Sequence, residues 1–250
     1  MKTFVILLAT IIPILFLNGC MMVAVSPGGS GITLTGEHTQ DTVYVGSFEH
    51  LVITVPFYVS VHHSDLDYVT IDADIASAQN IAIEKIDDTL FVGMSGVSGF
   101  GFFGPPHLQP VAVITLGSSS LQSITATGAA TVLGYGVFYV DNMQLTLSAA
   151  SSGRFEIEAT NLDINVIGAS TINVQGFVQN LYANATGAST ARLNNLAAND
   201  ATLSAMGAST ITGLYVLDSL EADATGASTI RYSGDAIAVY RATGASTISR

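Results

Sequence analysis

Apolar or small residues alternate with polar residues through most of the chain beyond residue 120. One unbroken series of alternate positions is Leu162, Ile164, Val166, Gly168, Ser170, Ile172 and Val174. The same phase returns in the series that begin at Leu181, Leu203 and Leu220. A period of two is typical of extended strands with one buried face, and it is incompatible with helical repeats. The pattern therefore predicts an all-β structure.

A run of four small residues, Gly-Ala-Ser-Thr, repeats within this alternation. Its copies begin at Gly168, Gly187, Gly207, Gly226 and Gly244, at intervals of 19, 20, 19 and 18 residues (187 − 168, 207 − 187, 226 − 207 and 244 − 226). A fixed interval in this range indicates a solenoid in which each repeat forms one coil. Two fainter copies begin near Ile124 and Leu145, so at least seven coils are expected. We predict a parallel β-helix, or β-solenoid, with coils of about 19 residues over 118–250.

Each repeat is expected to form a corner of its coil. Gly and Ser point inward in this phase, and the corner positions are Gly168, Ser170, Gly187, Ser189, Gly207, Ser209, Gly226, Ser228, Gly244 and Ser246. Glycine permits a turn where a β-carbon would obstruct it. A buried serine hydroxyl needs a partner, which either a stacked hydroxyl or a corner carbonyl can supply.

The threonine of each repeat points outward, which makes a row of threonines a candidate binding face. This row consists of Thr171, Thr190, Thr210, Thr229 and Thr247. A repeated polar face of this kind suits a glycan or a protein ligand. The alternative is that threonine is simply favoured on an exposed strand.

Residues 32–117 are predicted to form a β-rich N-terminal part that is continuous with the solenoid. Short alternating or apolar runs occupy most of 43–92, and Asp87-Asp88 is typical of a hairpin turn. A glycine- and phenylalanine-rich segment, Phe100–Pro106, interrupts these runs. It is expected either to form an exposed adhesive tip or to fold back as a cap over the apolar end of the solenoid.

The first 19 residues have the features of a lipoprotein signal peptide. Lys2 precedes an apolar run over 4–17 that is too short for a typical membrane span. The run ends in Leu17-Asn18-Gly19-Cys20, which resembles a bacterial lipobox, and Cys20 is the only cysteine. We expect lipidation of Cys20, a lipid anchor and flexible tether over 20–31, and an outer-membrane location facing either the surface or the periplasm. The alternative is an ordinary cleaved secretory signal.

The charge of the chain argues against a nucleic-acid partner. The formal net charge is −12, and the positive residues beyond the signal are Lys85, Arg154, Arg192, Arg231, Arg241 and Arg250. So few positive residues predict no basic patch, which nucleic-acid binding requires.

Candidate catalytic and metal-binding residues are sparse. Glu221 and Asp223 lie on outward positions near Arg231 and Arg241, and paired carboxylates can perform acid–base chemistry or bind calcium. A solvated charged face is the preferred interpretation, because no second acidic cluster accompanies them. Adjacent residues of a strand point to opposite faces, so His62-His63 cannot chelate as one unit. We therefore expect no catalytic residue, no metal and no cofactor.

Three stretches resemble the family of putative auto-transporter adhesins with a head GIN domain. They are residues 46–74, residues 81–93 with their acidic turn before a Thr-Leu strand, and residues 121–132, which lead into the Gly-Ala-Ser-Thr coils. The resemblance covers most of 43–250. It implies a secreted or lipid-anchored bacterial protein with an all-β, β-helix-like fold, and the family has no established catalytic residues.

Three functional hypotheses follow. The first is a non-enzymatic, lipid-anchored cell-envelope protein whose solenoid surface serves adhesion or binds a glycan or protein. The second is a periplasmic structural or assembly protein of the envelope that self-associates through the solenoid ends. The third is a carbohydrate-active β-helix enzyme that uses Glu221 and Asp223.

Overall fold

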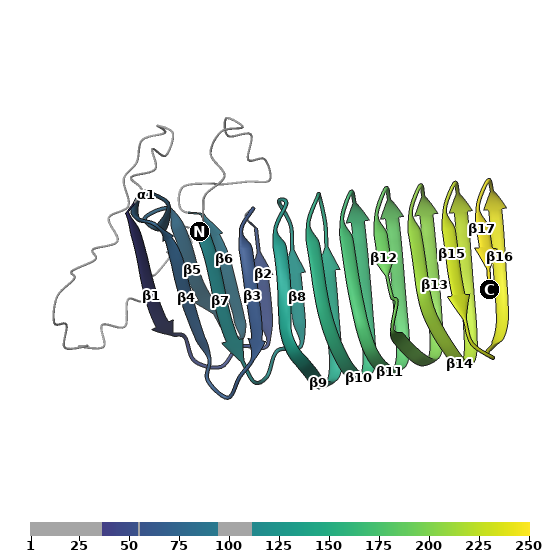
Figure 1. The fold of residues 1–250 in the computed structure, drawn as a ribbon, viewed down its shortest axis with the longest axis horizontal. Coiled ribbons are helices and arrows are strands. Elements are labelled where there is room, and N and C mark those ends of the chain that lie inside the picture. Colours follow the sequence, from purple (N-terminus) through teal and green to yellow (C-terminus); the bar gives the residue numbers. More distant parts are fainter. Residues whose placement is uncertain (1–36, 55, 95–111) are drawn as a thin grey trace, which may run out of the picture.

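A computed structural model describes residues 37–54, 56–94 and 112–250. Strands dominate these residues, and the helix α1 (Ile75–Ala78) is a single turn. Residues 123–249 form about seven turns of a β-solenoid with a spacing of about 19 residues, stacked along one axis (Figure 1). The predicted all-β solenoid and its coil length are therefore confirmed.

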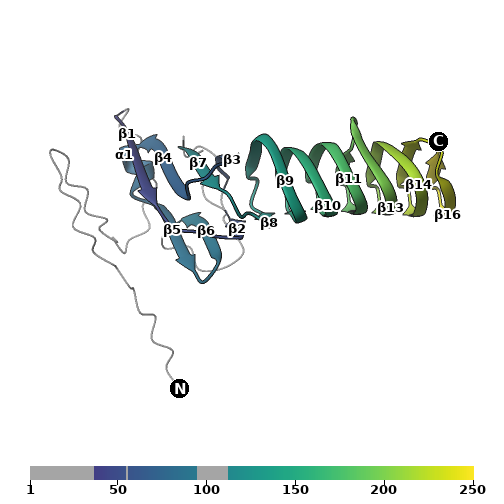
Figure 2. The same ribbon diagram turned by 90° about the horizontal axis from the view of Figure 1, so that it is seen from below.

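The strands fall into two groups along the chain. The first group is β1 (His38–Tyr44), β2 (His50–Ile53), β3 (Tyr58–His63), β4 (Tyr68–Asp74), β5 (Ile81–Ile86), β6 (Thr89–Met94) and β7 (Ala112–Ser118). The second group is β8 (Ser123–Ala126), β9 (Thr131–Leu147), β10 (Ser152–Gly168), β11 (Thr171–Gly187), β12 (Thr190–Arg192), β13 (Leu196–Gly207), β14 (Thr210–Gly226), β15 (Thr229–Ser233), β16 (Ile237–Gly244) and β17 (Thr247–Ser249). Figure 2 shows the regular stack of the second group.

Each long strand of the solenoid makes almost a complete coil. Strand β10 pairs in parallel with β11 from Ser152↔Thr171 to Gly168↔Gly187, and it pairs with β9 on its other side. The strand runs along one side of the coil, bends, and returns along the other side (Figure 1). The Gly-Ala-Ser-Thr corners therefore line one edge of the solenoid, and the broad bends line the opposite edge.

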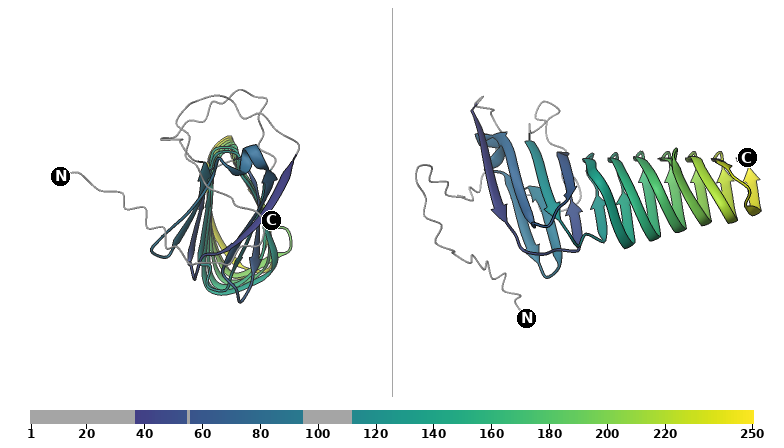
Figure 3. Two further views of the ribbon diagram at one scale, coloured as in Figure 1. Left: turned by 90° about the vertical axis from the view of Figure 1, so that its left-hand side faces the viewer. Right: turned by 60° about the horizontal axis from the view of Figure 1, so that its bottom comes forward.

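The N-terminal strands extend the same stack but not in chain order. Strand β2 pairs in parallel with both β6 and β8, and β3 pairs in parallel with both β7 and β9. The coil to which β2 and β3 belong thus lies between the strands β6 and β7 and the first coil of the second group (Figure 3). Antiparallel pairings of β4 with β7 and β1, and of β5 with β6, continue the sheet beyond it. The hairpin predicted at Asp87-Asp88 is confirmed by the β5–β6 pairing.

The core is a continuous stack of inward side chains along the solenoid axis. Leu145, Ile164 and Leu203 are among the buried residues that succeed one another in register. The rings of Phe138 and Phe155 pack edge to face, with centroids 6.4 Å apart. Burying a side chain of this size contributes about 1.5–3 kcal/mol. Burial of these stacked side chains, together with the backbone hydrogen bonds between parallel coils, holds the two sides of each coil in fixed positions.

Candidate functional site

The corner edge is built from stacked glycines. All five repeat glycines have a positive φ, as at Gly187 (87°) and Gly207 (83°). A β-carbon on Gly207 would lie 2.8 Å from the carbonyl oxygen of Gly187 in the preceding coil, which is too close. That carbonyl also accepts the N–H of Ala208 at 2.7 Å. Glycine is therefore required here both by the backbone conformation and by the close approach of the next coil.

The buried serines bind the corners of successive coils to one another. The hydroxyl of Ser209 donates to the carbonyl of Ala185 at 2.8 Å, and Ser189 and Ser228 make equivalent bonds to the preceding coil. Ser170 is equally buried, yet its hydroxyl has no hydrogen-bond partner in the protein. These four serine side chains face the interior, so they act in folding rather than in contact with a ligand. The prediction that the repeat glycines also point inward is wrong, because Gly187, Gly207, Gly226 and Gly244 are exposed and a β-carbon at each would meet the preceding coil instead of the core.

The outward threonines lie together in one row beside the corner edge. The pairing register connects Thr171, Thr190, Thr210, Thr229 and Thr247 across successive coils. The first four are partly exposed and Thr247 is exposed. Ser152 and Thr131 extend the row toward β9, and the Ser152 hydroxyl donates to the Thr131 hydroxyl at 3.1 Å. The structure thus forms a continuous hydroxyl face.

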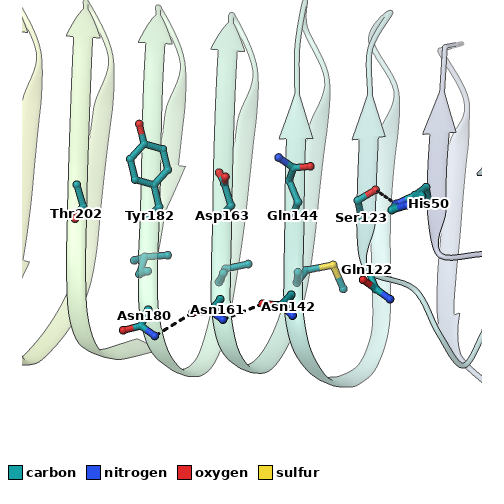
Figure 4. Close-up of a pocket in the computed structure, with 13 residues that line it drawn as sticks. His50, Gln122, Ser123, Asn142, Gln144, Asn161, Asp163, Asn180, Tyr182 and Thr202 are labelled. Carbon is teal, nitrogen blue, oxygen red and sulfur yellow. Dashed lines mark hydrogen bonds between the residues drawn. The ribbon is translucent and has the colours of Figure 1, made fainter.

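A second face, which we call the amide groove, lies on the side formed by the returning halves of the long strands. It is a surface depression of about 490 Å³ (Figure 4). Asn161 donates to Asn142 at 2.8 Å, and Asn180 donates to Asn161 at 2.9 Å. This ladder was not predicted from the sequence, although the 19-residue interval between its asparagines is visible in the chain. Each amide is held in orientation by its neighbour and retains hydrogen-bonding capacity toward solvent.

A parallel row of mixed side chains completes the amide groove. Figure 4 shows His50, Ser123, Gln144, Asp163, Tyr182 and Thr202 side by side. A ring nitrogen of His50 and the hydroxyl of Ser123 are 2.8 Å apart, and Asn165 donates to Asp163 at 2.6 Å. Burial raises the pKa of the Asp163 carboxyl, and hydrogen bonds from Asn165 and Gln144 oppose that rise. This groove contains amides, hydroxyls and one carboxylate, but its lining includes no lysine or arginine among the described residues.

The carboxylates considered for catalysis lie on outward positions of the solenoid, where Glu221 is exposed and Asp223 is partly exposed. Asp223 forms an ion pair with Arg241, with Oδ1 and Nε 2.8 Å apart, and both side chains are substantially exposed. Glu221 lies between Thr202 and Val239 in its row. Within the described ranges, no three His, Cys, Asp or Glu side chains are placed to hold a metal ion.

The two adjacent histidines point to different surroundings, as their strand position predicts. The ring of His62 stacks on Tyr135 with centroids 4.8 Å apart and planes 7° apart. His63 contacts the edge of Phe138, with centroids 6.4 Å apart. Aromatic contact accounts for both rings, so neither is placed to chelate with the other.

Several predictions fall on residues outside the described ranges. These are the signal peptide over 1–19, Cys20 with the tether over 20–31, and the Phe100–Pro106 segment. Within the described ranges, no helix has the length and apolar character that crossing a membrane requires.

The fold and its exposed rows define a β-solenoid protein with repeated polar side faces. The chain belongs to the family described as putative auto-transporter adhesin, head GIN domain, whose model matches residues 47–236. The resemblance drawn from the sequence is therefore confirmed. No curated protein matches the chain.

Solved structures with low sequence identity share this fold. A putative adhesin from Bacteroides fragilis is 20% identical, with a TM-score of 0.78 over 88% of this chain and 99% of that one. A putative lipid binding protein from Parabacteroides distasonis is 16% identical, with a TM-score of 0.69 over 86% of this chain and 97% of that one. A putative adhesin from Parabacteroides merdae is also 16% identical, with a TM-score of 0.65 over 86% and 96%. At these identities the likeness establishes the fold alone.

Proposed function

We propose that this protein is a non-enzymatic, lipid-anchored protein of the bacterial cell envelope that binds a partner through the side faces of its solenoid. The observation that carries the proposal is the repetition of ordered polar side chains along both sides, in the threonine row and in the amide groove. Repetition at one coil interval supports multivalent contact with a partner that is itself repetitive. Membership of an adhesin family supports the same role at the cell envelope.

The anchor is proposed from the chain ahead of the described residues. Leu17-Asn18-Gly19-Cys20 resembles a lipobox, and Ser26 to Gly31 contains the small residues and proline of a flexible tether. Acyl chains on Cys20 would hold the protein at a membrane, since each buried methylene contributes about 0.8 kcal/mol. The tether would let the solenoid stand away from the lipid surface.

Protease treatment of intact cells that carry the tagged protein tests the location. We expect external protease to remove the wild type from intact cells, and we expect Cys20→Ala to release the protein into the medium. Protection of the wild type until the outer membrane is broken would exclude direct adhesion. A wild type that is released as readily as Cys20→Ala would exclude the lipid anchor.

A periplasmic structural role is the second candidate function, and one observation favours it. The last coil exposes apolar side chains in rows that are polar elsewhere: Ile237 is 81% exposed and Val239 is 70% exposed. Their counterparts in the preceding coil are Ser219 and Glu221. Apolar residues beside an unpaired strand edge favour association with another β-structure. Protection from external protease, together with self-association that Ile237→Ser abolishes, would support this role.

A further inference from the structure

Three arginines form a row along the side of the solenoid that the first halves of the long strands make. The register across five coils is Arg154, Asn173, Arg192, Thr212 and Arg231, which we call the arginine row. The arginines occupy every second coil, so neighbouring ones are about 9.6 Å apart, twice the strand spacing. The small number of positive residues predicted no basic patch. The row is a local exception, because stacking brings three of the six positive residues beyond the signal into one line.

The guanidinium groups of the arginine row are free to bind a ligand. All three arginines are exposed, and no hydrogen bond or ion pair joins their side chains to another described residue. The other two arginines of the solenoid differ, because Arg241 is paired with Asp223 and Arg250 with Asp235. A free guanidinium presents a planar set of donors that matches a carboxylate or sulfate group.

Exposed aromatic rings lie on the intervening coils of the same side. The register here is Tyr139, Glu158, Phe177, Ala197 and Tyr215, which we call the aromatic row. Tyr139 is 62% exposed, Phe177 37% and Tyr215 43%. Successive coils therefore present a ring and then an arginine in alternation, with about four residues, or roughly 13 Å of strand, between the two rows. An exposed ring offers an apolar face on which a flat, partly apolar ligand can stack.

We infer that this side binds an acidic glycan with one anionic group in every second sugar, lying along the solenoid axis between the two rows. Such a chain repeats every two sugars, and the surface repeats every two coils. The uncharged sugar faces a ring, and the acidic sugar places its carboxylate on the arginine of the next coil. This inference rests on the proposed function, because it supplies the ligand class for one of the binding faces.

Local charge selects this side and limits where binding is strongest. Two carboxylates of β10, Glu156 and Glu158, lie on the same side, and Glu156 accepts a hydrogen bond from Gln175 at 3.0 Å. They would repel an anionic chain near β10, so contact is strongest from β11 to β15. The amide groove instead offers Asp163 and includes no lysine or arginine in its described lining, so it does not suit an anion.

Isothermal titration calorimetry of the full-length protein in detergent tests the inference with three hexasaccharides. A hyaluronan hexasaccharide carries one carboxylate per disaccharide, hexagalacturonate carries one per sugar, and cellohexaose carries none. We expect the hyaluronan fragment to bind most tightly, with an affinity that falls as salt rises. Hexagalacturonate has more charge. If it bound equally or more tightly, binding would follow total charge rather than the match between the two-sugar and two-coil repeats, and the inference would be overturned. Equal binding of cellohexaose, or the absence of binding by the hyaluronan fragment, would also overturn it.

Matched substitutions locate the binding side. Arg192→Gln is expected to weaken hyaluronan binding roughly tenfold, because a charged hydrogen bond is lost. Arg241→Gln makes the same charge change on the other side and is expected to alter the affinity by about twofold or less. Phe177→Ala should weaken binding, whereas Tyr182→Ala in the amide groove should not, and Glu158→Gln should strengthen it. Equal losses in Arg192→Gln and Arg241→Gln would refute the assigned side.

The protease experiment on intact cells separates this inference from the proposed function. Removal of the wild type by external protease, combined with no binding of the hyaluronan fragment, would refute the ligand class and leave the surface role standing. Binding of the fragment by a protein that is protected on intact cells would refute the surface role and leave the ligand class standing.

Discussion

The hydroxyl of Ser209 donates a hydrogen bond of 2.8 Å to the carbonyl of Ala185, which lies in the preceding coil. Both residues are fully buried. The bond satisfies a polar group inside the solenoid and joins two coils at a corner where the side chains are too small to bury much apolar surface. The stability of the corner edge therefore depends more on hydrogen bonds than the stability of the apolar core does.

Ser209→Ala is expected to destabilise the protein by about 1 kcal/mol, because it leaves the Ala185 carbonyl without its side-chain partner. Urea denaturation measures the change. Ser170→Ala is the matched control, since the Ser170 hydroxyl is equally buried but has no partner in the protein. That control should be neutral or stabilising. Equal destabilisation by the two substitutions would show that the hydrogen bond is not the cause.

Gly207→Ala is expected to destabilise the protein by more than about 2 kcal/mol, since the new β-carbon meets the Gly187 carbonyl and the backbone keeps a left-handed conformation. Gly136→Ala provides the comparison. Gly136 has a similar φ of 82° but no atom within 4 Å of the added β-carbon. It should cost about 1–2 kcal/mol. Thermal unfolding of both variants distinguishes backbone strain from the close approach of coils, and an equal cost would remove the steric explanation.

Asp163→Asn is expected to stabilise the protein only slightly at pH 7, by about 0.5 kcal/mol or less, because the carboxyl is partly exposed and solvent screens its charge. Burial raises the pKa of this carboxyl in the folded state, so its ionisation lowers stability as pH rises through that pKa. The amide removes this effect while keeping an acceptor for Asn165. The gain should disappear below pH 3.8, the ordinary aspartate pKa, where the wild-type carboxyl is protonated in both states. A gain that is the same at pH 7 and at pH 3 would contradict this account.

Asn161→Ala interrupts the asparagine ladder in its middle. It removes the donor to Asn142 and the acceptor of Asn180, so we expect a loss of about 0.5–1 kcal/mol. Asn142→Ala removes one bond only and should cost less. A double-mutant cycle of the two positions, read by urea denaturation, should show non-additivity, because both single changes break the same hydrogen bond. Strict additivity would mean that the ladder does not form in solution.

The solenoid itself was predictable because its contacts recur at a fixed interval along the chain. Each coil packs on the next one, about 19 residues further along, so a periodic sequence reports the neighbours directly. The inward phase of Leu162 and Ile164 and the corner at Gly168 followed from the alternation. The asparagine ladder and the arginine row obey the same rule at intervals of one and two coils, so the signal for both was present in the chain.

The stacking order of the N-terminal strands could not be predicted in this way. Strands β2 and β3 lie between strands that follow them in the chain, so no fixed interval relates Leu51 to its neighbours Leu90 and Ile124. Alternation identifies such strands and their buried faces, but it carries no information about which strand pairs with which.

The sequence by itself determined the all-β class, the coil length, the alternation of inward and outward side chains along the coil strands and the requirement for glycine at the corners. These follow from the strand period and from steric limits at each residue. Only the tertiary structure decided that the serine hydroxyls bind carbonyls such as that of Ala185 rather than one another, and that β2 and β3 enter the stack out of chain order. It also decided that the free arginines and the exposed rings alternate on one side. Those outcomes depend on distances between atoms of different coils. The stacking of the coils sets these distances, and the alternation of residues within one strand does not.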